Sequence, residues 1–475
     1  MHLERRRLLR GSLAALTTLG LAGCLPVLSP RRPTVVTVAY LGLGGPREAG
    51  LGRPGVTLLY KAALDLVRAH PGEIDLRVTS VTAPPPTPAM GPVPPPPPGQ
   101  PPPLPPTIAA LEQALNQEPA PDLVFFENLD EFAAAVRRTL LQPLDPLVQG
   151  DSPLRPADLF PGALAAVSDQ GALYGLPLAA EVLVLRYDQR LFSAAGLPPP
   201  DSTWTWTTLL NAARTLTQPD KGQYGLNLFS GHPLLILAAF LWQNGGDLVS
   251  PDGRRVLLTE GPALETLRFL YDLIHTHKVV ARPQLSARGA PGAPPPVRVV
   301  VGPVGPGEAP PLMGPGGQRV AMDFVITGGL YGGWWRPPGV QDWPLRLAEP
   351  PRGRVPASAL AVSGVLALTA RAADPRAAFQ VLAALAGELG KEVPLPASRP
   401  ALQTALQRPA APFTPDEGQV LGRALESARA LPPSVQSRLG AQVFQRLLQP
   451  LFEGTRKPEE IAQEAAAALE AALNS

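Results

Sequence analysis

Proline restricts the fold of this chain more than any other residue type. The 475 residues include 63 prolines, which are concentrated in residues 83–106 and in a Pro/Gly-rich stretch over residues 287–316. Proline has no backbone N–H to donate, and consecutive prolines hold the chain in an extended polyproline conformation. Neither segment is therefore expected to form a helix or a central strand. We expect both to be insertions outside the cores, acting as solvated spacers; a ligand for a proline-binding module is the alternative interpretation.

The N-terminus carries an export pattern. Arginines at positions 5, 6, 7 and 10 precede a short apolar stretch, which ends in the run Leu-Ala-Gly-Cys at residues 21–24. This run is a lipobox, which predicts that residues 1–23 are a lipoprotein signal peptide, that Cys24 carries the lipid and that residues 24–33 are a tether. An ordinary cleaved signal with a chance cysteine is the alternative, and the export route, general secretory or twin-arginine, stays open. The pattern predicts a protein anchored to the cell membrane on its extracytoplasmic face.

Composition excludes several functions. The net charge is +2 without blocks of like charge, so nothing indicates a nucleic-acid partner. Cys24 is the only cysteine, which excludes a zinc site of the cysteine type. A histidine site would have to draw on His70, His232, His275 and His277, of which the last two point to different faces of a helix. We expect no metal and no cofactor.

Hydrophobic periodicity predicts an α/β fold. Strands are expected over residues 34–40, 74–78 and 122–126, with helices over 56–69 and 107–117 between them. This β-α-β-α-β order is typical of a parallel sheet covered by helices, whose ligands bind at the carboxyl ends of the strands. After removal of the leader, about 450 residues remain, which is enough for two domains.

The rest of the chain continues to alternate and then becomes helical. Cap and first-turn signals at Asp374-Pro375 and Thr414-Pro415 mark helix starts in the C-terminal part. The remaining expected helices cover residues 207–216, 233–244, 262–275 and 458–473, and the expected strands cover 182–187, 319–326, 358–361 and 365–369.

Six phrases follow one another in a fixed order behind the lipobox. They are His70-Pro71, residues 121–126 (PDLVFF), 144–147 (LDPL), 174–181 (YGLPLAAE), 242–247 (WQNGGD) and 317–322 (GQRVAM). In this order they resemble the extracellular solute-binding proteins of family 1, the sugar-binding lipoproteins and periplasmic proteins of ABC importers, and the maltose-binding branch in particular. The most specific phrase, YGLPLAAE, leads into Tyr187-Asp188-Gln189, a weakened form of the family's Tyr-Asn-Lys.

The resemblance implies a two-lobe periplasmic-binding-protein fold of type II. Each lobe would be a mixed, mostly parallel sheet flanked by helices, with the ligand cleft between the lobes. Lobe I would comprise residues 34–180 and about 349–395, and lobe II residues 181–348 and about 396–475. The implied protein is a monomer that is not an enzyme, and it passes a sugar or oligosaccharide to the transmembrane subunits of an ABC permease.

A sugar site needs planar rings to stack on the C–H faces and charged groups to bind the hydroxyls. The expected rings are Tyr331, Trp334 and Trp335, which follow a predicted strand; because neighbours on an extended chain face opposite ways, one tryptophan should be buried. Trp204 and Trp206 are expected to be structural instead.

The resemblance places an aromatic and an acidic ligand directly after the third strand, at Phe126, Glu127 and Asp130. Asn128 or Asp130 is alternatively the cap of the following helix. Glu181 matches a sugar-binding glutamate of the maltose-binding branch and stands in an apolar stretch. Tyr40 and His232 are weaker candidates.

Two alternatives stay open. An anchored carbohydrate-active enzyme would use Glu127 and Glu181 as paired carboxylates, although no hydrolase motif is present. A binding-dead envelope scaffold is the other, because the Tyr-Asn-Lys phrase is degraded.

Overall fold

The computed structural model describes residues 33–43, 54–83, 105–148, 155–228, 232–251, 253–282, 311–314, 317–328, 343–408 and 413–473. The lipobox, most of both proline-rich segments, and Tyr331, Trp334 and Trp335 lie outside these residues. Within them, no helix combines the length and hydrophobicity that a membrane crossing requires.

A mixed sheet forms the centre of the molecule. Its strands follow the order β2-β1-β3-β10-β6-β8-β7, with β9 beside β6 and β11 beside β10. As predicted, β1 is parallel to β2 and β3, whereas β10 is antiparallel to both β3 and β6. The bounds are β1 Thr34–Leu43, β2 Ile74–Ala83, β3 Leu123–Phe126, β6 Gly175–Asp188, β7 Gln223–Asn227, β8 Arg319–Gly328, β9 Leu345–Ala348, β10 Ser358–Leu368 and β11 Ala428–Arg429; β4 (Ser168–Asp169) and β5 (Ala172–Leu173) form a separate pair.

Helices cover the sheet, and eight of the fourteen α-helices in the described residues begin with proline. Proline is suited to the first helical position, where its missing N–H would have no partner anyway. Asp374 and Thr414 cap the helices that follow them, as predicted. The bounds are α1 Pro54–Ala69, α2 Pro106–Leu115, α3 Leu129–Arg137, α4 Pro161–Ala166, α5 Gln189–Ala194, α6 Trp206–Leu216, α7 Pro233–Gln243, α8 Gly261–Tyr271, α9 Pro375–Gly390, α10 Arg399–Leu406, α11 Pro415–Ser427, α12 Pro433–Val443, α13 Gln449–Glu453 and α14 Pro458–Leu473.

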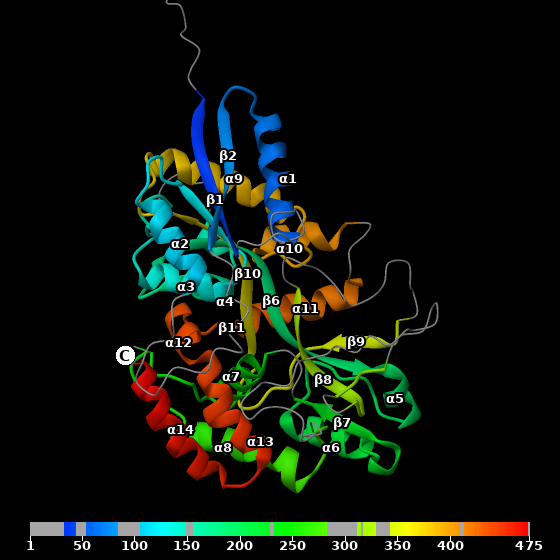
Figure 1. Cartoon of the computed structure of the whole chain (residues 1–475). Helices are drawn as coiled ribbons and strands as arrows, with labels where there is room; N and C mark the ends of the chain where they lie inside the picture. Colours follow the sequence, from blue (N-terminus) through cyan, green and yellow to red (C-terminus); the bar gives the residue numbers. More distant parts are fainter. Residues whose placement is uncertain are drawn as a thin grey trace, which may run out of the picture.

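Two large hydrophobic cores lie on either side of the middle of this sheet. The first contains β1, β3, α1, α2, α3 and α9, and the second contains α6, α7, α8, α12 and α14. Figure 1 shows the two groups of elements one above the other, with β6 and β10 running between them. Along β6, Leu176 and Leu178 near the start belong to the first core, whereas Leu185 and Tyr187 near the end belong to the second. Along β10, Ala359 near the start belongs to the second core and Leu366 near the end belongs to the first. The two long strands therefore join the two lobes.

The C-terminal part divides between the lobes differently from the prediction. We expected residues from about 396 onward to belong to lobe II, but Leu402, Leu421 and Leu425 pack in the first core. Leu431 is the first buried residue after them that belongs to the second core. Helical periodicity identifies the buried face of a helix without identifying the surface that covers it, which explains the difference.

The strand β10 is continuous where the sequence predicts two short strands. Gly364 lies between the two predicted strands and has a φ of +68°, a conformation that glycine adopts without a steric penalty. It stands next to Val365, which pairs with Pro177 of β6. The backbone thus bends at Gly364 while the strand continues from one lobe into the other.

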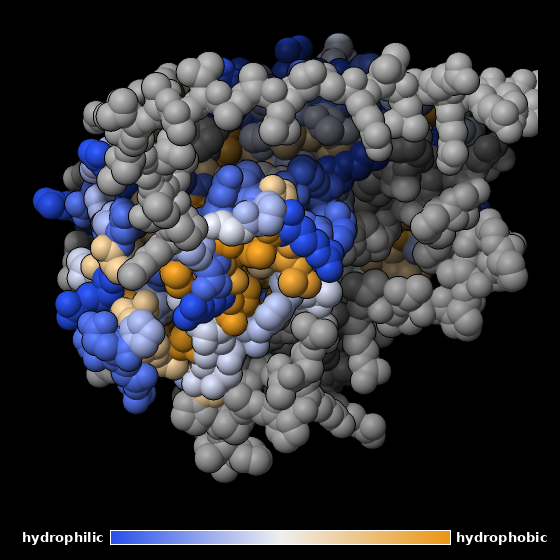
Figure 2. All heavy atoms as spheres, turned by 90° about the horizontal axis from the view of Figure 1, so that it is seen from above, coloured by the Kyte–Doolittle hydropathy of each residue, from blue (hydrophilic) through white to orange (hydrophobic). Residues whose placement is uncertain are grey.

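Exposed hydrophobic side chains are scattered over the described surface. Val35, Leu64, Met313 and Val355 are the large hydrophobic residues that are exposed there. Seen from above, the molecule presents a group of hydrophobic residues surrounded by hydrophilic ones (Figure 2). Val35, Leu64, Met313 and Val355 lie in different segments, and single exposed apolar residues are ordinary for a protein surface in water.

Candidate functional site

The candidate site lies where the two lobes meet. The strands β1 and β3 end there, and the helices α3 and α7 begin beside them with Asn128 and His232 at their N-caps. Because the carboxyl ends of parallel strands meet at one edge of a sheet, the turns that follow them gather around one crevice. The long strands β6 and β10 connect the lobes at this place.

Glu181 stands on β6 at the junction of the two lobes. It pairs with Ala361 of β10 on one side and with Gly328 of β8 on the other, and its strand neighbours Ala180 and Val182 are fully buried. Glu181 itself remains partly exposed. Among the described residues, its carboxylate has no hydrogen bond or ion pair. An ionised carboxylate in an apolar strand needs donors from elsewhere, and the hydroxyl groups of a ligand can supply them.

Glu127 follows β3 and lies against the first turn of α1. Its carbonyl oxygen accepts a hydrogen bond of 3.3 Å from the backbone N–H of Gly364. A Cβ atom added to Gly55 would lie 2.5 Å from Glu127 Oε1, so the missing side chain of Gly55 makes room for this carboxylate. An acidic group at a helix N-terminus is favoured by the helix dipole. Glu127 is therefore positioned by β10 and α1 together.

Asn128, rather than Asp130, caps α3: its side chain accepts a hydrogen bond of 2.9 Å from the backbone N–H of Glu131. Asp130 is exposed to water, yet the surrounding protein desolvates it and raises its pKa, against the attraction of Arg137 and His232. His232 starts α7 of the second lobe, so Asp130 of the first lobe stands near enough to the start of α7 for the charge of His232 to act on it.

Two arginines extend this charged region. Arg137 ends α3, and α12, which carries Arg438, packs against α3 from the second lobe. Desolvation and then repulsion by Arg438 lower the pKa of Arg137, while Asp130 and Asp169 oppose the change. Neither arginine was predicted from the sequence, since a single arginine on an amphipathic helix has the pattern of a residue on a solvated face.

Tyr40 is partly buried near the end of β1 and contacts Tyr60 of α1. Their ring centroids are 6.1 Å apart in an edge-to-face arrangement. Partial burial, followed by the charge of Tyr40 and a hydrogen bond with it, raises the pKa of Tyr60. Tyr60 was not a candidate in the sequence, because the apolar periodicity of its helix indicates packing alone.

Phe126 does not lie in the crevice. Its side chain is 0% exposed in the first core, where its ring packs edge-on against Phe132 at 5.7 Å. The last residue of a strand buried on both faces is taken up by the core, and only the following turn reaches the ligand side. We therefore remove Phe126 from the candidate residues.

The tryptophans expected to be structural are structural. Trp204 is buried in the second core. Trp206 stacks on Phe269 at 4.5 Å and donates its Nε1–H to Gln243 over 2.7 Å. Among the described residues, no group of three or more histidine, cysteine, aspartate or glutamate residues could hold a metal ion.

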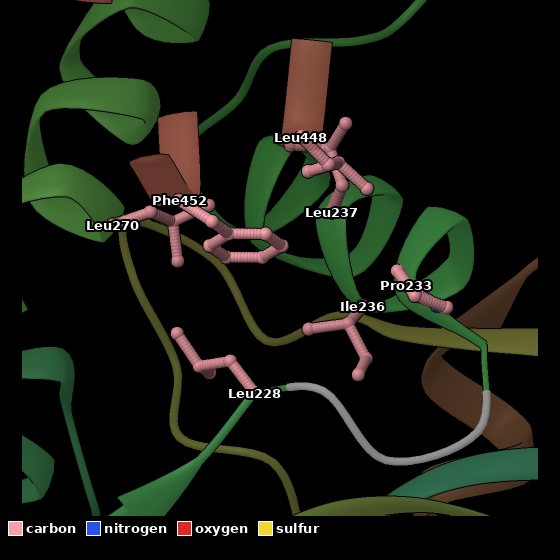
Figure 3. Close-up of a pocket in the computed structure, with 7 residues that line it drawn as sticks. All are labelled: Leu228, Pro233, Ile236, Leu237, Leu270, Leu448 and Phe452. Carbon is pink, nitrogen blue, oxygen red and sulfur yellow. The ribbon is translucent and has the colours of Figure 1, made fainter. Parts of the chain in front are cut away.

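A small pocket beside the start of α7 differs in chemistry from this crevice. Figure 3 shows its lining side chains pointing toward one another. All are apolar: Leu228, Pro233, Ile236, Leu237, Leu270, Leu448 and Phe452. Such a lining cannot hydrogen-bond the hydroxyls of a sugar, so we place the candidate site at Glu181 and the turns around it.

Comparisons with known proteins agree with this arrangement. The family model described as "Bacterial extracellular solute-binding protein" matches residues 106–391, more than half of the chain. The chain belongs to this family of solute-binding proteins. The predicted resemblance is therefore confirmed, and so is the two-lobe fold of type II.

Individual relatives are distant from this solute-binding protein. A mannitol-binding protein of Pseudomonas aeruginosa is 44% identical over 71 residues, which are 15% of this chain and only 16% of that relative. The cyclic α-maltosyl-1,6-maltose binding protein of Arthrobacter globiformis has a TM-score of 0.63 at 16% identity, covering 93% of this chain and 100% of that one. A family 1 protein of Alicyclobacillus acidocaldarius has a TM-score of 0.61 at 14% identity, covering 94% and 100%. At these identities the two structures show the fold alone.

Proposed function

We propose that this protein is the lipid-anchored, extracytoplasmic substrate-binding component of an ABC importer, and that it captures a sugar or oligosaccharide by lobe closure and delivers it to the permease. The partly exposed carboxylate of Glu181 carries the proposal, since it stands at the junction of the lobes in an otherwise apolar strand. The family match supports a solute as the ligand.

The ligand contacts follow from the chemistry of these side chains. Glu181 accepts hydroxyl protons from the floor of the cleft, and one ionised carboxylate can accept two of them. Glu127 and Asp130 contribute further acceptors from lobe I, and Tyr40 contributes an aromatic ring. His232 contributes a polar imidazole ring from lobe II. Closure brings the two sets together around one ligand.

The remaining parts of the proposal come from the sequence. Tyr331, Trp334 and Trp335 supply stacking surfaces, with one of the two tryptophans in the cleft and the other in a core. Cys24 carries the lipid anchor, and the protein acts as a monomer. Residues 34–180 and 349–428 constitute lobe I in this proposal, and residues 181–348 and 431–473 constitute lobe II.

A ligand screen tests the proposal. The purified protein is incubated with a panel of monosaccharides, oligosaccharides and sugar alcohols, and its melting temperature is measured together with the composition of each sugar. We expect one class to raise the melting temperature with increasing concentration, following RT ln(1 + [L]/Kd), and to be recovered unchanged. New reducing ends would show an anchored enzyme instead, and no shift with any compound would favour the binding-dead scaffold.

A further inference from the structure

Beside β6 and β10, a third segment passes from the first lobe to the second. Ala428 packs in the first core and Leu431 in the second, so the passage occurs over a few residues. There the short strand β11 pairs with Ser358 and Ala359 at the start of β10. This third crossing, residues 426–431, thus lies against one of the long strands that join the lobes.

The first-lobe end of the third crossing is fixed by Arg399. Its Nε and Nη2 atoms donate to the two carboxylate oxygens of Glu426 over 2.6 and 2.7 Å. Its Nη1 atom donates to the carbonyl oxygens of Ala157 and Leu159 over 3.0 and 2.8 Å. The guanidinium also lies 5.3 Å from the ring centroid of Phe160, which is buried in the first core. A guanidinium that forms a two-pronged ion pair and also lies against an aromatic ring can adopt few orientations.

The second-lobe end is fixed by Arg429 through a single carboxylate oxygen and an aromatic ring. Its Nη2 atom donates to Asp247 Oδ2 over 2.6 Å, and its guanidinium lies 4.7 Å from the ring centroid of Trp242. Trp242 is 2% exposed in α7 and donates its Nε1–H to the other oxygen of Asp247 over 2.9 Å. The carboxylate, the ring and the guanidinium therefore hold one another in place.

These two contacts leave only Ser427 and Ala428 between Glu426 and Arg429. A Cβ atom added to Gly162 of α4 would lie 2.7 Å from the carbonyl oxygen of Ala428, so the first lobe approaches this segment as closely as glycine permits. Exposed ion pairs add little stability on their own, so the effect of these pairs lies in the geometry that they impose.

We infer that Arg399 and Arg429 are positioning residues of the hinge: they confine the turning of the third crossing to the short link between Glu426 and Arg429 and thereby set the axis and range of lobe closure. This inference rests on the closure in the proposed function. A protein binds its ligand in proportion to the population of the competent conformation, so a looser hinge changes ligand affinity without touching the ligand.

Interlobe distances in the ligand-free protein test the inference. Cys24 is the only cysteine, so Cys24→Ser followed by Leu64→Cys in α1 and Ala467→Cys in α14 gives one spin label on each lobe at exposed positions. Pulsed electron spin resonance then measures the distance distribution in the full chain. The variants are Arg429→Gln and Arg399→Gln. The matched control is Arg268→Gln, which removes a 2.5 Å pair with Glu459 that joins α8 and α14 within lobe II.

We expect a broader, shifted distribution for Arg429→Gln and Arg399→Gln, and the parent distribution for Arg268→Gln. Circular dichroism verifies folding, and Arg429→Lys and Arg399→Lys, which keep the charge but lose the planar group, replace any variant that does not fold. Unchanged distributions in all folded variants would overturn the inference. Since no sugar is present, this outcome is independent of whether the protein binds one.

Discussion

Glu181 is the single side chain on which the proposed site depends most. In the variant Glu181→Gln the strand keeps its shape, but a neutral amide replaces the carboxylate that accepts hydroxyl protons. We expect the dissociation constant of the sugar to rise about tenfold, or ~1.4 kcal/mol, in titration calorimetry, with the unliganded melting temperature unchanged. Glu118→Gln, at an exposed position outside the cleft, is the control. Intact affinity combined with lost stability would show that the carboxylate serves the fold.

Removing the charge of Asp130 should raise the stability of the folded protein, whereas removing the charge of Glu181 should leave it unchanged. Desolvation raises its pKa above the ordinary value of 3.8, so the folded protein binds this proton more tightly than the unfolded chain does. The stabilising contribution is therefore present at low pH and is lost as the pH rises through the folded pKa. We expect Asp130→Asn to melt at a higher temperature than the parent at neutral pH, to lose this advantage near pH 4, and to bind the sugar more weakly. A lower melting temperature at neutral pH would contradict this account.

Features with local surroundings are visible in the sequence, whereas those that tertiary packing decides are not. Glu181 interrupts an apolar strand, which is visible in the sequence. Tyr60 and Arg438 stand on helices whose partners come from distant segments, and their periodicity says nothing of those partners. The prediction that Phe126 contacts the ligand was wrong for the same reason, because the last residue of a strand can belong either to the core or to the cleft.

Among the elements, helix starts were predictable and strand lengths were not. A capping residue followed by proline gives a local chemical signal, which is why Asp374 and Thr414 mark their helices correctly. The strand β6 begins at Gly175, seven residues before the predicted start at Val182, because the apolar run before Glu181 has no alternation to reveal a strand. The sequence likewise predicted two short strands in place of β10, because Gly364 interrupts the apolar run.

A buried ion pair joins the neighbouring strands β6 and β8, and its removal should destabilise the sheet. Arg186 donates to both carboxylate oxygens of Asp323 over 3.0 and 2.6 Å, and the two side chains are 17% and 3% exposed. Asp323→Ala leaves the guanidinium without its partner in the protein interior, so we expect the free energy of unfolding to fall by about 3–5 kcal/mol in urea titration. The double variant Arg186→Met/Asp323→Leu should recover most of this loss. A loss below ~1 kcal/mol in Asp323→Ala would show that water replaces the carboxylate.

For the whole molecule, the arrangement of two lobes with a cleft between them was predictable only from the family resemblance. Composition and periodicity established an α/β fold with enough residues for two domains, and they did not reveal that one sheet extends through both lobes. The placement of residues 396–408 and 413–428 with the first core shows how the C-terminal helices divide: α10 and α11 complete lobe I, and α12 to α14 complete lobe II. The chain therefore passes between the lobes at β6, β10 and β11, which is the layout that a closing hinge requires.

Small-angle X-ray scattering with and without the stabilising sugar tests the central claim most directly. The account predicts that saturation with this sugar decreases the radius of gyration, that the sugar is recovered chemically unchanged, and that Glu181→Gln shifts the transition to about tenfold higher sugar concentration. Binding that leaves the scattering profile of the protein unchanged would contradict the claim that the lobes close around the ligand.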